Sequence, residues 1–187
     1  MAFGQVVDAK SPFTSGHSAR VALVADHVAT ALGMEADQRR WLRHGALLHD
    51  VGKLGVSNAI LDKPGKLDPW EWAEVQRHAL HTEQILSRIS SFGALARVAG
   101  AHHEKLDGTG YPRGLDARHI RLETRIITTA DIFDALTADR PYRPAMPTGT
   151  ALQVMREGIG SSIDADCFAA LERSLGALGV FSAFGAL

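Results

Sequence analysis

The stretch Leu47-Leu48-His49-Asp50-Val51-Gly52-Lys53 places an imidazole, a carboxylate and an amine together at the end of an apolar helical run. Neighbouring residues of a helix point about 100° apart. His49 and Asp50 can therefore face two adjacent metal ions, with the carboxylate bridging them, and Lys53 lies three residues beyond Asp50, within reach of the same face. A His-Asp pair also occurs in purely structural hydrogen bonds, so its meaning depends on the other ligand-type residues of the chain.

The composition is ordinary for a globular protein except in its histidines. The 187 residues suit one domain, with 45% hydrophobic and 22% charged residues. A formal net charge of -1 gives no general attraction to nucleic-acid polymers or membranes, so an anion must be bound by a local cluster. Nine histidines are present, and the single cysteine, Cys167, excludes an internal disulfide framework. We expect a cytoplasmic protein without a signal peptide or membrane span.

Apolar residues recur at helical spacing through most of the chain, and no segment shows sustained alternation, so the sequence predicts an all-α fold. We expect a lead-in at residues 1–13, one domain at 14–175 and an extension at 176–187. The predicted helices number about seven and run approximately from 14 to 33, from 36 to 49, from Asp68 past His78, and over 91–105, 122–137, 150–157 and 165–175.

Two of these helices rest on specific signals. Asp68-Pro69-Trp70-Glu71 has the form of a capping box, with Asp68 as N-cap, proline at the first helical position and Glu71 three residues after the cap. The segment 122–137 is rich in β-branched residues, which favour a strand, but Ile126, Ala130 and Phe133 keep helical spacing. The helical spacing of the apolar residues is a stronger indicator than the β propensity of the individual residues, so we predict a helix.

Seven ligand-type residues lie at or near the ends of these helices. Five imidazoles and two carboxylates exceed the needs of one divalent ion and suit two ions that share Asp50. A mixed histidine and carboxylate set without thiolate suits iron or manganese better than a structural zinc. Asp134, one turn beyond Asp131, either orients a ligand or is only a carboxylate on the helix face, and we slightly favour the first role. The candidate ligands are His17, His49, Asp50, His78, His102, His103 and Asp131.

The chain resembles the HD-GYP family of the HD phosphohydrolase superfamily. The resemblance covers roughly residues 14–175 in one register. The segments that carry it are His49-Asp50-Val51-Gly52-Lys53, Ile60-Leu61-Asp62-Lys63-Pro64-Gly65-Lys66-Leu67, His102-His103-Glu104-Lys105-Leu106-Asp107-Gly108-Thr109-Gly110-Tyr111-Pro112, Ala130-Asp131-Ile132-Phe133-Asp134-Ala135-Leu136-Thr137 and Arg140-Pro141-Tyr142-Arg143.

This resemblance implies an HD-domain helical bundle and a phosphodiesterase that opens cyclic di-GMP to linear pGpG, in some members on to GMP. The family's metal ligands fall on the same seven residues. Asp50 and Lys53 would be catalytic, and the substrate would contact Lys53, Arg140, Arg143 and Tyr111. The loop Gly110-Tyr111-Pro112 is linked in the family to pocket shape and to contacts with diguanylate-cyclase-type domains; its glycines alone also allow a loop that only turns the chain.

Two positions depart from the family. Members that hold three metals carry a glutamate four residues before the first ligand histidine, where this chain has Phe13. Phenylalanine cannot coordinate a metal, so we expect two ions, with a water held between them attacking phosphorus in line with the departing ribose oxygen. Lys53 would stabilise charge or donate a proton to the leaving oxygen, and both roles stay open. Thr82 stands where many members carry glycine.

Three other readings compete with this one. Related HD phosphohydrolases act on deoxynucleotides, alarmones or nucleoside monophosphates, but they generally lack the His-His-Glu and Gly-Tyr-Pro elements. Nothing in the sequence reads guanine directly, so other cyclic dinucleotides remain open as substrates. A metal-stabilised binding or interaction module with little turnover is a second alternative. The third is a helical bundle whose histidines are only structural.

Overall fold

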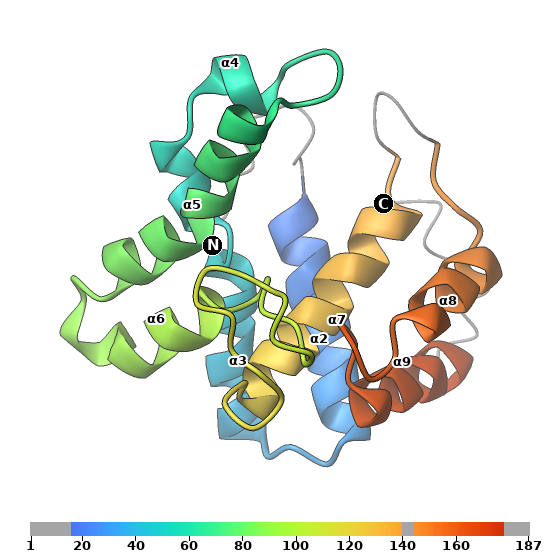
Figure 1. Cartoon of the computed structure of the whole chain (residues 1–187). Coiled ribbons are helices and arrows are strands. Elements are labelled where there is room, and N and C mark those ends of the chain that lie inside the picture. The colour runs from blue at the N-terminus through green and yellow to red at the C-terminus, as the bar shows by residue number, and fades with distance from the viewer. Residues whose placement is uncertain (1–15, 140–143, 178–187) are drawn as a thin grey trace.

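The computed structural model describes residues 16–139 and 144–177, and the regular structure of these residues is helical (Figure 1). The all-α prediction is confirmed. The helices of this part of the chain are α2 (His17–Ala31), α3 (Ala36–Leu48), α4 (Asn58–Leu61), α5 (Pro69–Leu86), α6 (Gly93–Ala99), α7 (Leu122–Thr137), α8 (Thr148–Glu157) and α9 (Ala165–Ala177), with the 3-10 helices η2 (Val51–Gly55) and η3 (Ser90–Phe92).

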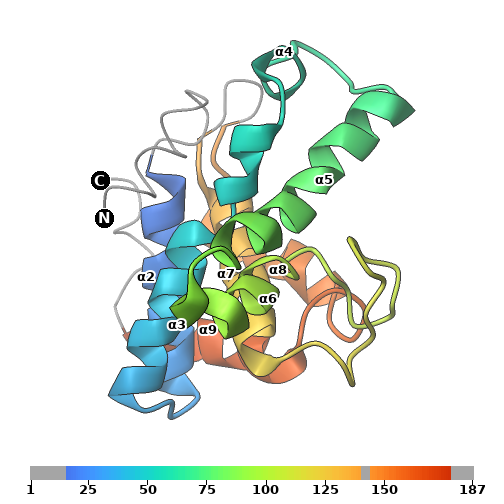
Figure 2. The same cartoon turned by 90° about the vertical axis from the view of Figure 1, so that its left-hand side faces the viewer.

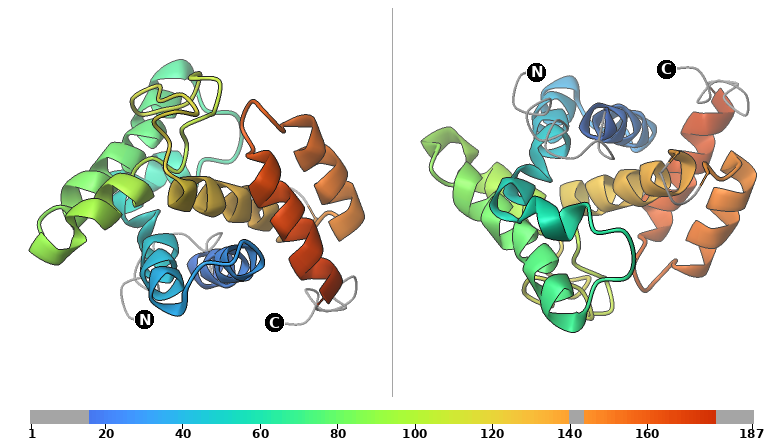
Figure 3. Two further views of the ribbon diagram at one scale, coloured as in Figure 1. Left: turned by 90° about the horizontal axis from the view of Figure 1, so that it is seen from below. Right: turned by 90° about the horizontal axis from the view of Figure 1, so that it is seen from above.

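Helix α7 is the centre of the arrangement. In Figure 3 it lies between the α5–α6 pair on one side and the α8–α9 pair on the other. α2 packs against α3, α7 and α9, while α5 packs against α6 and η2. Figure 2 shows α4 and the beginning of α5 projecting from the rest of the bundle. The turn between α3 and η2, which carries His49 and Asp50, therefore joins the α2–α3–α7 part to the α5–α6 part.

Two groups of buried apolar side chains hold these parts together. The larger one is built from α2, α3, α7, α8 and α9, and includes Val28, Leu42 and Phe133. The smaller one, which includes Val51 and Leu86, lies under η2, α5 and α6. Each fully buried side chain of this size stabilises the fold by about 1.5–3 kcal/mol. The site residues lie between two rigidly packed groups.

The predicted start of α5 is confirmed in detail. The Glu71 N–H donates to Asp68 Oδ1 and the Asp68 N–H donates to Glu71 Oε2, both at 2.8 Å, with Pro69 as the first helical residue. These reciprocal bonds satisfy backbone donors that a helix start leaves free. The start of α5 is therefore fixed.

α7 is a helix from Leu122 to Thr137, as its period predicts. Its threonines form hydrogen bonds that relieve the conflict with β propensity. Thr129 and Thr137 donate to the carbonyls of residues one turn earlier, at 2.8 and 2.7 Å, while Thr124 and Thr128 donate to the Val98 and His102 carbonyls of a neighbouring segment. The hydroxyls thus bind α7 to the segment that carries the histidine pair.

The prediction of a helix over residues 91–105 is wrong in its extent. α6 spans only Gly93–Ala99 and is followed by turns that carry His102 and His103. The His102 carbonyl accepts from the Thr128 hydroxyl at 2.7 Å and the His103 carbonyl accepts from the Tyr111 N–H at 3.1 Å. These partners from outside the segment replace the helical hydrogen bonds that the periodic pattern suggests.

The remaining boundaries agree closely with the predictions. His49 caps the C-terminus of α3, and α9 extends two residues past the predicted end at Leu175. The short helix α4 is not among the helices predicted from the sequence. α2 begins one residue after Gly16, its N-cap, and Phe13, Arg140 and Arg143 lie outside the described residues. Among the helices described, none is long and apolar enough to span a bilayer.

Candidate metal centre

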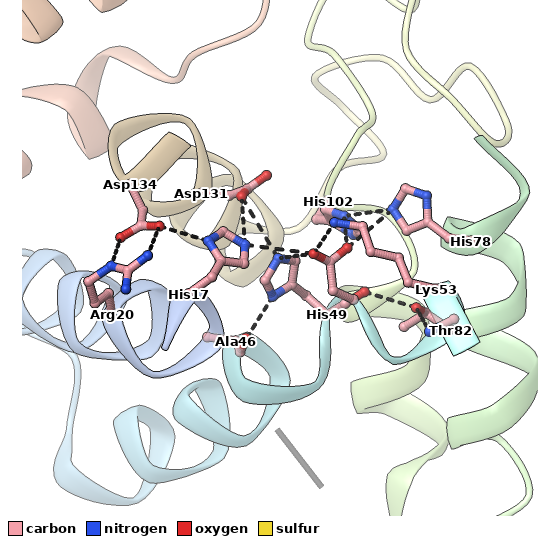
Figure 4. Close-up of polar contacts among 12 residues, drawn as sticks. His17, Arg20, Ala46, His49, Lys53, His78, Thr82, His102, Asp131 and Asp134 are labelled. Carbon is pink, nitrogen blue, oxygen red and sulfur yellow. Dashed lines mark hydrogen bonds and ion pairs between the residues drawn. The ribbon is translucent and has the colours of Figure 1, made fainter. Parts of the chain in front are cut away.

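The seven predicted ligands come together from five segments of the bundle. Figure 4 labels five of them, His17, His49, His78, His102 and Asp131. Their donor atoms form three overlapping groups, within each of which all atoms lie within 4.8 Å of one another. The first residue of α2, the α3–η2 turn, the middle of α5, the turn after α6 and the middle of α7 supply them. The residues in that order are His17, then His49 and Asp50, His78, His102 and His103, and Asp131.

The Asp50 carboxylate lies between two sets of donors. Its Oδ2 atom is 3.6 Å from His17 Nε2 and 3.5 Å from His49 Nε2. Its Oδ1 atom is 3.4 Å from His78 Nε2 and 3.8 Å from His102 Nε2. Each carboxylate oxygen therefore faces a different set of imidazoles, which is the arrangement that a bridging carboxylate needs.

Asp131 and His103 extend these two sets. Asp131 Oδ1 lies 3.4 Å from His17 Nε2 and 3.8 Å from His49 Nε2, so it belongs with the α2 and α3 histidines. His103 groups with His78 and His102. We call the first set the α2 side (His17, His49, Asp131) and the second the α5 side (His78, His102, His103).

The site leaves buried polar atoms without hydrogen-bond partners. His49 Nε2 and Asp50 Oδ1 are both inaccessible and unpaired, and His49 and Asp50 are 0% and 3% exposed. Leaving such groups unpaired costs about 1–3 kcal/mol each, and more when they are charged. A divalent cation between the donors would satisfy both atoms, so the residues present fit a metal centre.

Backbone carbonyls orient three of the imidazoles. Nδ1 of His49, His78 and His102 lies 2.7, 2.6 and 2.7 Å from the carbonyl oxygen three residues earlier in each case. A carbonyl only accepts, so Nδ1 carries the proton and donates it. Nε2 of each ring is therefore left with its lone pair directed into the cluster, as a metal ligand requires.

His17 is oriented differently, by a carboxylate. Its Nδ1 atom lies 2.7 Å from Asp134 Oδ2, and Arg20 donates through Nε to Asp134 Oδ1 at 2.6 Å. Asp134 is 4% exposed. The aspartate that the sequence predicts to orient a ligand therefore contacts His17, one helix away, and is itself held by Arg20 (Figure 4).

Burial and neighbouring charges shift the pKa values of the site histidines in opposite directions. Burial lowers the pKa of His78, His102 and His103, that of His103 to about 4, so these imidazoles are neutral near pH 7. Burial also opposes protonation of His17, but its hydrogen bonds to Asp131 and Asp134 raise its pKa to about 9. Burial acts to raise the pKa of Asp50, yet the Lys53 ammonium holds it well below its usual value.

Thr82 attaches the His-Asp turn to α5. Its hydroxyl donates to the His49 carbonyl and accepts from the Gly52 N–H, both at 2.9 Å. A side chain on Gly52 would lie 1.9 Å from the His78 carbonyl oxygen, so only glycine allows this close approach. The sequence marks Thr82 as a departure from the family but gives it no role. Thr82 is 33 residues from His49 and 30 from Gly52 along the chain, so no local sequence pattern indicates these contacts.

Glu104 is a second residue whose role the sequence does not predict. It is 2% exposed and accepts from the Arg113 and Leu115 N–H groups at 2.7 and 2.8 Å. These bonds hold the loop after His103 over the cluster. At Gly110 a side chain would lie 2.3 Å from the Lys105 nitrogen, so the glycine serves close packing as well as turning.

Tyr111 and Lys53 reach the cluster from this loop and from η2. The Tyr111 ring centroid is 4.7 Å from that of His103, and Lys53 Nζ donates to Asp50 Oδ2 at 2.5 Å. The loop therefore lies against the donors on the side of His103, and its role in shaping a substrate pocket stays a prediction. Arg140 and Arg143, the predicted substrate-binding arginines, fall in the segment that the structure does not describe.

Comparison with known proteins agrees with this geometry. A family model described as an HD domain matches residues 2–167. The chain belongs to the HD-domain family. This HD domain is 64% identical over 177 residues to the 3'3'-cGAMP-specific phosphodiesterase 3 of Vibrio cholerae serotype O1, covering 95% of the chain and 38% of the relative. It is 40% identical over 164 residues to the cyclic di-GMP phosphodiesterase response regulator RpfG of Xanthomonas campestris pv. campestris, covering 86% and 43%.

Solved structures give the same relationship. A crystal structure of a cyclic GMP-AMP-specific phosphodiesterase of V. cholerae is 58% identical, with a TM-score of 0.60, over 94% of the HD domain and 39% of that chain. An HDGYP-type protein of Bdellovibrio bacteriovorus, 22% identical, has a TM-score of 0.70 over 89% and 53% of the two chains and shows the shared fold. The resemblance to HD-GYP proteins is confirmed. The HD domain spans about two fifths of the length of the curated relatives described above.

Proposed function

We propose that this HD domain is a metal-dependent phosphodiesterase of cyclic dinucleotides, with 3'3'-cGAMP as its first candidate substrate. The observation that carries the proposal is the position of Asp50, whose two oxygens face two sets of ligand-type residues. Two adjacent divalent ions are a recurrent arrangement for hydrolysing phosphate esters. The names of the relatives supply the class of phosphate ester.

The proposal places one ion on the α2 side and one on the α5 side, with Asp50 shared. The α2 side offers two imidazoles and a carboxylate, and the α5 side offers three imidazoles. Without thiolates, these sets suit iron or manganese. When bound, such ions activate water and neutralise charge on the phosphate. The chain's own part is to hold neutral imidazoles on the α5 side and an ionised Asp50 in place, which burial and Lys53 achieve.

Lys53 brings a positive charge to the exposed edge of the cluster. Its side chain is 25% exposed and its ammonium group contacts Asp50 Oδ2. An ammonium held there can interact with a phosphate oxygen or donate a proton to the leaving ribose oxygen. Removing it should lower the rate of hydrolysis more than it lowers the metal content, because it does not belong to either ligand set.

The choice among cyclic dinucleotides rests on the relatives. Over the aligned residues, the V. cholerae phosphodiesterase named for 3'3'-cGAMP is 64% identical to this chain, whereas RpfG, named for cyclic di-GMP, is 40% identical. We therefore place 3'3'-cGAMP first. Cyclic di-GMP, the substrate that the sequence resemblance implies, is the second candidate. The contact of the Gly110-Tyr111-Pro112 loop with diguanylate-cyclase-type domains stays a prediction.

The test is hydrolysis of 3'3'-cGAMP, cyclic di-GMP and cyclic di-AMP by protein reconstituted separately with ferrous iron and manganese. We expect linear dinucleotide from 3'3'-cGAMP fastest, loss of activity in His49→Ala, and full activity in His119→Ala, whose imidazole is exposed beside Asp116. Metal and nucleotide binding without product would instead indicate a binding module. An equal loss of activity in His49→Ala and His119→Ala would show that the metal centre is not the site of hydrolysis.

A further inference from the structure

Trp72 extends the aromatic surface that begins at the metal centre. It lies in the first turn of α5 and is 48% exposed. Its ring centroid is 6.4 Å from that of Tyr111, with the planes at 82°. The Tyr111 ring in turn lies 4.7 Å from the ring of His103 and 6.4 Å from that of His78. Two ring contacts thus connect Trp72 to the α5-side ligands.

We call Trp72 and Tyr111 the aromatic wall. Its two rings come from different elements, α5 and the loop after His103, and both elements are fixed. The capping box holds the start of α5, and Lys63 forms an ion pair with Glu71 in the same turn at 2.6 Å. The Tyr111 N–H donates to the His103 carbonyl at 3.1 Å.

An ion pair between Arg113 and Glu83 joins the loop directly to α5. The wall is therefore formed before any ligand binds. Binding to a preformed surface avoids the entropic cost of ordering side chains.

A half-exposed indole next to a phosphate site has a chemical match in the base of a nucleotide. Purines stack on aromatic side chains, and the interaction needs no particular base because every base has a π face. A phosphate of the substrate held at the metal centre would carry its ribose and purine toward the surroundings of that centre, and the wall is the aromatic part of those surroundings.

We infer that Trp72 stacks on a purine of the bound cyclic dinucleotide and so contributes to substrate affinity without taking part in the chemical step. This inference rests on the proposed function, because it takes the substrate class from it. Trp72 determines affinity for purine-containing diesters as a class; discrimination between guanine and adenine requires hydrogen-bonding groups, which stacking does not supply.

The neighbouring Trp70 provides a matched control. It is 66% exposed and belongs to the same helical turn, but residues two apart on a helix point about 200° from each other. Trp70 therefore faces away from the direction of Trp72. Replacing either indole by alanine removes the same amount of aromatic surface, so only the difference in position is tested.

The experiment compares Trp72→Ala, Trp72→Phe and Trp70→Ala in steady-state hydrolysis of 3'3'-cGAMP and cyclic di-GMP. Metal content and circular dichroism are measured for each variant. We expect Trp72→Ala to raise KM about tenfold with kcat within about twofold of the wild type, Trp72→Phe to keep most of the affinity, and Trp70→Ala to match the wild type. An unchanged KM in Trp72→Ala, or equal changes in both alanine variants, would overturn the inference.

A binding measurement separates this inference from the proposed function. Calorimetric titration with a slowly hydrolysed phosphorothioate analogue of 3'3'-cGAMP reports affinity whether or not the protein turns over. Binding that Trp72→Ala weakens, in a protein without hydrolysis, would support the stacking role and contradict the enzyme. Hydrolysis by the wild type, together with unchanged binding in Trp72→Ala, would support the proposed function and contradict the stacking role. A wild type that neither binds nor hydrolyses would contradict both.

Discussion

Asp134 is the residue on which the position of His17 depends. It accepts from Arg20 and contacts His17 Nδ1 at 2.7 Å, while His49, His78 and His102 are held by backbone carbonyls. A carboxylate that contacts a ligand histidine fixes its orientation and increases its basicity. Of these four imidazoles, His17 is therefore the one whose orientation a single side-chain substitution can disturb.

The variant Asp134→Asn should weaken metal binding by about 10–100-fold, because the amide no longer supplies the negative charge that supports His17. Competition with a chromophoric chelator measures this affinity. Asp26→Asn is the control, since Asp26 forms an ion pair with Arg39 away from the ligands. Equal affinities in Asp134→Asn and the wild type would show that His17 needs no such support.

Thr82 gives a second test at the scale of one side chain. Thr82→Val keeps the shape but leaves the Gly52 N–H and the His49 carbonyl without their partner, at a cost of about 1–3 kcal/mol for each buried group. We expect lower stability to denaturant together with weaker metal binding, and recovery of both in Thr82→Ser. Thr124→Val is the control, because its hydroxyl donates to Val98 instead. The same metal affinity in Thr82→Val and Thr124→Val would contradict a role in holding the His-Asp turn.

At the scale of elements, α9 depends on a single cap. Asp164 Oδ1 accepts from the Asp166 and Cys167 N–H groups, both at 3.0 Å, and Oδ2 accepts from Arg125 at 2.8 Å. Partial burial acts to raise the pKa of Asp164, but the Cys167 N–H and Arg125 lower it below its usual value of 3.8. Its contribution to stability is thus fully present above about pH 4 and is lost as the pH falls through the lowered pKa.

Asp164→Ala should therefore reduce the free energy of unfolding by about 1 kcal/mol at pH 7. The difference from the wild type should stay constant down to about pH 4 and shrink below it. Urea unfolding at a series of pH values measures both quantities. A difference that grows on acidification would contradict the assignment of an ionised cap.

The elements were predictable from sequence where local interactions decide them. The Asp68 cap, the period of residues 122–137 and the end of α3 at His49 all follow from neighbours within a few positions. α6 ends early for a reason that local rules do not include: the Thr128 hydroxyl on α7 and the Tyr111 N–H across the following loop bind the carbonyls of the histidine pair.

The same distinction applies to the site. Its ligands were predictable because imidazoles and carboxylates at helix ends are chemically distinctive. The roles of Thr82 and Glu104 were not, because each acts on backbone atoms of a segment remote in sequence or on the far side of a loop. Arg140 and Arg143 remain sequence predictions.

At the scale of the whole molecule, the ligands connect parts of the bundle that have separate apolar groups. The α2-side residues lie on or directly after helices of the larger group, and the α5-side residues lie on α5 and in the turn after α6, two helices that contribute to the smaller group. Metal ions shared through Asp50 would hold the two parts together. Ligands that bind only the folded state stabilise it by mass action, by about 2.7 kcal/mol at a concentration 100 times the Kd.

Removal of metal by a chelator should then lower the Tm by about 5–10 °C for a chain of this size. Differential scanning calorimetry with and without the chelator measures the shift. Asp50→Ala should show little or no shift, because it lacks the shared ligand. A Tm that does not respond to chelation in metal-loaded wild type would indicate that the two parts are held by apolar packing alone.

The central claim is that Asp50 is shared by two metal ions, and anomalous diffraction from crystals of the manganese-reconstituted protein tests it most directly. We predict two anomalous peaks per chain, one beside His17, His49 and Asp131 and the other beside His78, His102 and His103, with Asp50 between them. A single peak on one side of Asp50, or none, would contradict a bridging carboxylate and the two-metal hydrolysis that rests on it.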